Sequence, residues 1–172
     1  MATLPIEPTN KSFLSNNKFD FVIDRLPNIQ FFIQTINLPT ISLGIATTPT
    51  PFVTVQTPGT IITFEEITVS YIVDEDMKSW FEIYDWLHAL AGTEGFPKST
   101  LKNSPGSYEN FTSSATLIIK TNSNNANVKL KFFDLFPTNL SGFQLSATES
   151  HDFITSTVTF NYSKYEADYI WF

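Results

Sequence analysis

The sequence has no cysteine, only two histidines and a single arginine, Arg25. The absence of cysteine excludes disulfide bonds, thiolate zinc sites and cysteine nucleophiles, and it fits a reducing compartment. A formal net charge of −7 with so few cations argues against a surface that grips nucleic acid, because such binding needs clustered lysine and arginine to displace phosphate counterions.

Motifs of enzymatic chemistry are also absent. The chain contains no Gly-x-Ser-x-Gly elbow, Walker A loop, dinucleotide glycine fingerprint or His-Glu-x-x-His motif. His88 and His151 have no second histidine or cysteine at metal-ligand spacing. The acidic run Asp74-Glu75-Asp76 lacks the spacing and the glycine of a calcium loop, and it favours a helix N-terminus. The sequence thus predicts a protein that is not an enzyme and holds no cofactor and no metal.

The N-terminus has neither the basic region nor the apolar region of a signal peptide, and nowhere do eighteen apolar residues occur together. We therefore expect no secretion by that route and no stable membrane insertion.

Charge is missing altogether from Leu26 to Phe64, where no Asp, Glu, Lys, Arg or His occurs. Polar residues and the loop prolines Pro39, Pro49 and Pro58 keep this stretch too polar for a membrane span. A solvated surface normally carries mixed charges. The neutral stretch therefore indicates backbone that becomes buried against another protein.

The rest of the composition describes a globular chain. Its 172 residues, with 42% hydrophobic and 15% aromatic content, favour one domain with a real core. We expect a single domain over residues 1–172, with an extended N-terminal segment at residues 1–17 and a long projecting loop or arm at residues 38–59. Some of the aromatic side chains are expected to serve neighbouring subunits.

Alternation of apolar residues with period two predicts most of the secondary structure. Lys18–Asp24 and Ile29–Asn37 are expected to form a hairpin, and Thr60–Val73 a long strand with an irregularity at Glu65–Glu66. Ala115–Lys120 and Asn127–Phe133 predict a second hairpin, and Phe153–Tyr165 the last strand.

One helix is expected over Asp76–Ala91, where apolar residues follow at helical spacing until Gly92. Trp80, Phe81 and Leu87 are expected to anchor it on a sheet, together with Tyr84. The predicted fold is mainly β, a β-sandwich or partial barrel of two packed antiparallel sheets with one flanking α-helix.

In this order of elements, three segments carry a resemblance. They are the opening Asn17–Ile23 followed by Asn37-Leu38-Pro39, the aromatic-Pro-Thr-Asn turn at Phe136–Asn139, and the ending Ser156–Tyr162. Together they resemble the tail tube proteins of contractile-tailed, T4-like bacteriophages, including marine and cyanophage members. The resemblance covers nearly the whole chain.

The resemblance implies a structural virion protein, synthesised in the host cytoplasm and located in the virion tail. Six copies would close into a ring, and stacked rings would form the inner tube that conducts double-stranded DNA into the host without binding it specifically. Further implied partners are the tail sheath, baseplate and tail terminator proteins. The resemblance places the subunit interface in the projecting arm, at Leu38, Pro39, Pro49, Pro51, Phe52, Val53 and Pro58.

Two alternatives remain open from the sequence. Baseplate proteins that initiate the tube share its fold, so the chain fits a tube-initiator or hub ring as well. Strands rich in threonine, asparagine and aromatic residues also fit a carbohydrate-binding β-sandwich module, which would be a monomer that binds glycans.

Overall fold

The computed structural model describes residues 11–91, 111–146 and 153–169. These residues form nine strands, one α-helix and one short 3-10 helix, η1 (Ile29–Phe31). The strands and the helix, in chain order, are β1 (Phe19–Ile23), β2 (Ile33–Ile36), β3 (Ile41–Pro49), β4 (Thr54–Phe64), β5 (Ile67–Ile72), α1 (Lys78–Ala91), β6 (Ser113–Lys120), β7 (Ala126–Leu140), β8 (Thr155–Asn161) and β9 (Lys164–Tyr169).

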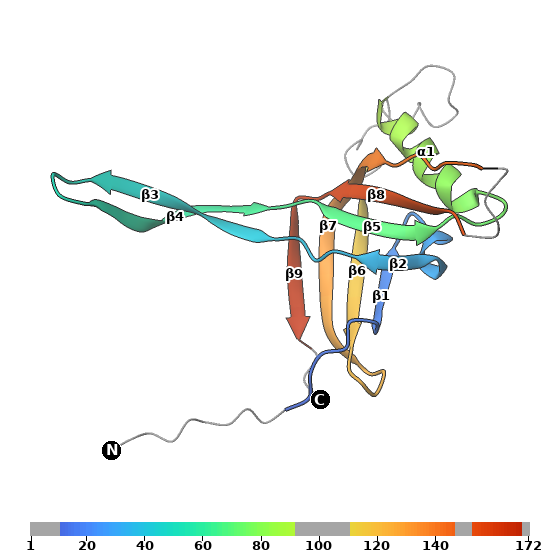
Figure 1. Cartoon of the computed structure of the whole chain (residues 1–172), viewed down its shortest axis with the longest axis horizontal. Helices are drawn as coiled ribbons and strands as arrows, with labels where there is room; N and C mark the ends of the chain where they lie inside the picture. Colours follow the sequence, from blue (N-terminus) through green and yellow to red (C-terminus); the bar gives the residue numbers. More distant parts are fainter. Residues whose placement is uncertain (1–10, 92–110, 147–152, 170–172) are drawn as a thin grey trace.

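The body of the molecule consists of two antiparallel sheets that share β7 (Figure 1). Sheet I contains β1, β6, the first part of β7 and β9, and sheet II contains β2, β5, β8 and the last part of β7. Asp134, which has a φ of 56°, lies between the two parts of β7. This arrangement confirms the predicted mainly β fold with two antiparallel sheets and one flanking helix.

Alternating side chains from both sheets form one core. On β5 every second residue is buried, namely Ile67, Val69 and Tyr71, because period-two alternation places them on the inner face of sheet II. Phe132 of sheet I is fully buried, and its ring lies edge-on to the rings of Phe21 and Tyr162. The core thus depends on large aromatic side chains from distant parts of the chain.

The predicted hairpin of Lys18–Asp24 with Ile29–Asn37 is wrong. β1 pairs with β6, so that Phe19 lies opposite Ile119, whereas β2 pairs with β5 in the other sheet. The connection is not a simple turn, because Leu26 and Ile29 are buried in the core. Burying these two side chains takes the chain from sheet I to sheet II, so the two strands never become neighbours.

One other strand prediction is confirmed, because β6 and β7 form the expected second hairpin. The expected long strand Thr60–Val73 is wrong. The irregularity at Glu65–Glu66 separates β4, which pairs with β3, from β5, which pairs with β2 and β8. The predicted last strand is instead divided into β8 and β9, which pair with different parts of β7. The Phe136–Asn139 turn also lies within β7, where the pairing with β8 shifts register.

Helix α1 exists where a helix was predicted, but it begins at Lys78 and buries a different face. Ile83, Trp86 and Ala89 are buried, while Phe81 is 48% exposed. Trp86 also donates a hydrogen bond from Nε1 to the Phe111 carbonyl oxygen at 2.8 Å. The expected anchor Phe81 is therefore wrong. Ile83 and Trp86 are the buried anchors, and the expected anchor Leu87 is partly buried against the core. No helix of the described residues is long and apolar enough to cross a membrane.

Candidate assembly interface

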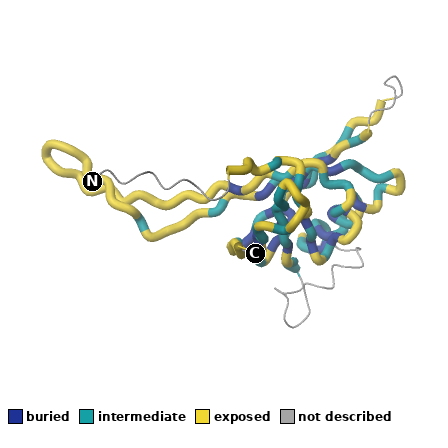
Figure 2. The backbone as a smooth tube through the Cα atoms, turned by 90° about the horizontal axis from the view of Figure 1, so that it is seen from below, coloured by how far each residue is buried: buried dark blue, intermediate teal, exposed yellow. Residues whose placement is uncertain are grey.

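The second part of the neutral stretch, from Ile41 to Phe64, forms a long β-hairpin, β3–β4, which projects away from the body (Figure 1). The first part belongs to the body, where Leu26 and Ile29 are buried. Residues 41–49 of β3 are all exposed, and so is most of β4 (Figure 2). A two-stranded hairpin is only marginally stable in water by itself. Long edge strands without charged residues are also prone to pair with other chains. The β3–β4 hairpin is therefore the first candidate for an assembly surface.

Large apolar side chains are spread along this hairpin. Cross-strand partners share a face of a sheet, so the pair Leu43 and Ile62 forms an apolar row at the base of the hairpin with Ile41. The exposed large apolar residues of the hairpin and its entry are Leu38, Ile41, Leu43, Ile45, Phe52, Val53, Val55, Ile61 and Ile62. Contiguous exposed apolar surface of this kind marks interaction sites.

The tip of the hairpin is a defined turn. The Thr50 backbone N–H donates to the Val53 carbonyl oxygen at 3.1 Å, and the Val53 N–H donates to Thr50 Oγ1 at 3.2 Å. The Thr50 hydroxyl also donates to the Val53 carbonyl oxygen. Between these residues Phe52 is 97% exposed. The turn thus presents a phenyl ring to solvent on a hydrogen-bonded support.

The seven residues expected at a subunit interface do not share one environment. Leu38, Pro49, Pro51, Phe52, Val53 and Pro58 are exposed on the hairpin or at its entry, whereas Pro39 is buried in the chain's own fold. Pro39 differs from the other six in this respect, and the assignment of all seven residues to a subunit interface stays a prediction.

Sequence reasoning missed the apolar residues inside the two strands, such as Ile45 and Ile61, because the prolines favoured a loop. Pro49 lies at the end of β3, and Pro58 pairs with Ile45 on a strand that has a free edge. Proline is tolerated on edge strands. The signal that could have identified a hairpin was the alternation of isoleucine, leucine and valine with threonine on both sides of Thr50–Val53.

Two glycines allow the hairpin strands to approach where their register shifts between Leu43 and Ile45. A Cβ atom on Gly59 would lie 2.5 Å from the Gly44 carbonyl oxygen and 2.8 Å from its carbonyl carbon. A Cβ atom on Gly44 would meet only the Ile61 carbonyl oxygen, at an ordinary 3.5 Å.

Gly59→Ala is therefore expected to destabilise the hairpin by about 1–3 kcal/mol, because backbone must move to accept the methyl group. Amide hydrogen exchange should become faster within residues 41–64 and stay unchanged in β5. Gly44→Ala is the matched control and should leave the exchange rates near those of the parent. Equal exchange in both variants would show that the two strands do not approach as described.

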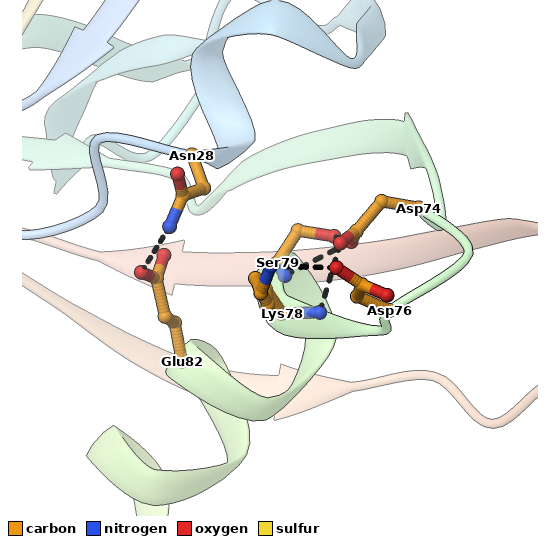
Figure 3. A network of polar contacts seen from close by, with 6 residues as sticks. All are labelled: Asn28, Asp74, Asp76, Lys78, Ser79 and Glu82. Carbon is orange, nitrogen blue, oxygen red and sulfur yellow. Dashed lines mark hydrogen bonds and ion pairs between the residues drawn. The ribbon is translucent and has the colours of Figure 1, made fainter.

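The acidic run Asp74-Glu75-Asp76 stabilises the start of α1 (Figure 3). The Asp74 carboxylate accepts hydrogen bonds from the backbone N–H groups of Lys78 and Ser79, both at 3.0 Å, and from the Ser79 hydroxyl. Asp76 pairs with the Lys78 ammonium at 2.6 Å on the surface. These contacts confirm the predicted helix N-terminus.

The pKa of Asp74 reflects two opposing effects. Desolvation by burial acts to raise this pKa, but the hydrogen bonds from the Ser79 side chain and from the Ser79 and Lys78 backbones outweigh it. The pKa of Asp74 is therefore lower than usual. A lowered pKa in the folded state stabilises the fold at pH values above the unfolded pKa of about 3.9, and this contribution disappears as the pH falls through the folded pKa.

Asp74→Ala is expected to lower the free energy of unfolding by about 0.5–2 kcal/mol at neutral pH, as loss of a helix cap does. Urea unfolding of the parent and of Asp74→Asn, which keeps an acceptor oxygen but cannot titrate, should show a difference that shrinks below about pH 4. A difference that is constant with pH would contradict the role of the carboxylate charge.

Of the two histidines, only His88 lies in the described part of the chain. His88 lies on α1 with its ring 4.2 Å from that of Tyr84, and His151 lies outside the described residues. Within residues 11–91, 111–146 and 153–169, no three His, Asp or Glu side chains are grouped to hold a metal ion.

Two sequence comparisons relate this chain to phage tail proteins. A sequence model of the family described as phage tail tube protein matches residues 3–168. The tail tube terminator protein of Enterobacteria phage T4 is 29% identical over 144 residues, which cover 78% of this chain and 77% of that protein.

Solved structures share the fold at low sequence identity. The tube terminating cap of the anti-feeding prophage (AFP) has a TM-score of 0.66 and 14% identity, over 99% of this chain and 100% of that chain. A chain of the PVC sheath-tube complex, an extracellular contractile injection system in the extended state, has a TM-score of 0.64 and 13% identity, over 93% of this chain and 94% of that chain. A chain of the 6-fold symmetrised AFP baseplate has a TM-score of 0.64 and 10% identity, over 92% of this chain and 97% of that chain.

The match to the family model spans nearly the whole chain, and the fold agrees with it independently. The protein therefore belongs to the phage tail tube protein family, a family of structural proteins.

Proposed function

We propose that this chain forms a ring that ends the tail tube of a contractile phage tail, in the manner of a tube terminator. The single observation that carries the ring is the β3–β4 hairpin, whose apolar side chains are exposed in the isolated chain. The terminal position is supported by the relative from phage T4, whose name is tail tube terminator protein, and by the fold of the AFP tube terminating cap.

Ring formation follows from the physics of the hairpin. Exposed apolar surface and unpaired strand edges are stabilised when another chain covers them. In a closed ring every copy both provides a hairpin and receives one, so no hairpin stays uncovered. Six copies are proposed because the AFP baseplate, which shares the fold, is 6-fold symmetrised.

The charge of the chain suits a ring around a DNA path. A formal net charge of −7 repels a polyanion, so double-stranded DNA could pass through the opening without being held. In this position the neighbours would be the last ring of the tube and the end of the sheath. The PVC sheath/tube terminator, which has the same fold, supports this placement.

The second candidate is the repeated subunit of the tube itself. It is favoured by the description of the family and by the likeness to a chain of the PVC sheath-tube complex. The two functions differ in the contacts between rings. A terminator needs a partner ring on one side only, whereas a tube subunit stacks on further copies of itself on both sides.

Negative-stain electron microscopy and light scattering of the purified chain separate the candidates. A terminator is expected to form single rings of one defined mass, and a tube subunit to form hollow rods whose length grows with concentration. A persistent monomer with affinity for sugars in a glycan-binding assay would overturn both functions in favour of a carbohydrate-binding module.

A further inference from the structure

The structure holds a cleft that could receive the exposed hairpin of another copy. We propose that the tip of the β3–β4 hairpin docks into the groove between β1 and β2 of the neighbouring subunit. This inference rests on the proposed ring and names the surface that would receive the arm.

The groove has a defined place and size. A cleft of about 670 Å³ lies between residues within 16–22, which include most of β1, and residues within 30–35, which include parts of η1 and β2. A second cleft of about 430 Å³ shares Asn16, Phe19, Gln34 and Thr35 with the first and extends it toward Leu38. The two clefts together form a continuous groove along the seam between sheets I and II.

Both walls of the groove are strands at the end of the sheet order. β1 pairs only with β6, and β2 pairs only with β5, among the residues that the structure describes. Their other edges offer backbone donors and acceptors to an extended segment. Addition of a strand to such an edge is a common mode of recognition, in which backbone hydrogen bonds supply affinity.

The chemistry of the groove matches that of the hairpin. Phe31 is 80% exposed at the groove, and the only charged residue of the larger cleft, Asp20, pairs with Lys120 at 2.5 Å. The hairpin carries no charged residue. The smaller cleft adds Lys18, whose ammonium donates a hydrogen bond to the Asn122 carbonyl oxygen at 2.7 Å. The larger cleft, with its paired Asp20 and an exposed phenyl ring, suits a neutral tip that presents Phe52, because neither side has to desolvate an unpaired charge.

The groove and the hairpin lie on different sides of the body. In Figure 1 the hairpin leaves the body on the side of β9, whereas β1 and the η1 end of β2 lie on the opposite side. β3 has nine residues and spans roughly 30 Å at about 3.4 Å per residue, enough to reach across to a neighbour. A contact between two different surfaces is heterologous, and heterologous contacts form a ring when the rotation between neighbouring copies closes.

Disulfide trapping tests this contact, because the chain has no cysteine of its own. Phe52→Cys and Gln34→Cys chains with different tags are mixed, assembled and oxidised, and the mixed dimer is measured on a non-reducing gel. Ser123→Cys, in the exposed β6–β7 turn, replaces Gln34→Cys as the control. Each variant must first form rings by microscopy, and Val53→Cys replaces Phe52→Cys if the latter does not.

The expected result is on the order of tenfold more mixed dimer with Gln34→Cys than with Ser123→Cys, because docking raises the effective concentration of the two thiols. Rings that give equal cross-linking at both positions would overturn the groove as the docking site while leaving the ring intact. Failure of the parent chain to form rings or rods would overturn the proposed function and the docking contact together.

Discussion

Replacing Phe160 with alanine is expected to lower the free energy of unfolding by about 3–5 kcal/mol, a large loss for a domain of this size. Phe160 lies on β8 with no exposed surface, and its ring lies 6.2 Å from that of Trp86 on α1. Its removal leaves a cavity between sheet II and the helix, which the surrounding rigid sheets can fill only in part. Chemical denaturation followed by tryptophan fluorescence measures the loss.

Phe52→Ala is the matched control for this substitution. It removes the same atoms from a ring that is 97% exposed, so the free energy of unfolding of the monomer should change by less than about 0.5 kcal/mol. If Phe160→Ala lowered the free energy of unfolding as little as this control, β8 would not lie in the core of the body.

Replacing Phe52 with aspartate is expected to abolish assembly while the monomer stays folded. In the free chain the new carboxylate is hydrated at the tip of the hairpin, so denaturation and circular dichroism should match those of the parent. In the ring the same charge would be desolvated without a partner, at several kcal/mol per ion. Each contact should then weaken by on the order of a hundredfold or more, and light scattering should report monomers.

Ser123→Asp provides the matched charge control, since it adds the same carboxylate to an exposed turn far from the hairpin tip. This variant should assemble like the parent. Rings or rods of normal size from Phe52→Asp would refute burial of the tip between subunits. Global unfolding of Phe52→Asp would instead place Phe52 in the core of its own chain, against its observed exposure.

The position of the helix could be predicted from the spacing of apolar residues, but its buried face could not. Its position was predictable because apolar residues recur at helical spacing and acidic residues precede them. The buried face was not, because aromatic residues lie around most of the helix. Trp80 stacks on Tyr84, and the ring of Phe81 lies edge-on to both, with ring centroids 5.2 to 6.3 Å apart. Ile83 and Trp86 are buried in the core, and Leu87 and Leu90 are partly buried against it.

The sequence indicated the uncharged hairpin segment but not the groove. The neutral segment was visible in the sequence, since absence of charge needs no structure to be recognised, and its second part is the exposed β3–β4 hairpin. The groove was not visible, because β1 and β2 come from separate sheets and meet only when both sheets pack. No local pattern in either strand indicates that its second edge stays free.

By itself, the sequence determined the mainly β class, the existence of the helix, the acidic run at its N-terminus and the uncharged character of the hairpin. These features depend on spacings within about ten residues, where side-chain periodicity and capping act directly. Tertiary structure alone decided that β1 pairs with β6, that Pro39 is buried and that Phe81 faces outward. Such choices depend on which distant apolar surfaces fit together with the fewest voids, and close packing is a property of the whole fold.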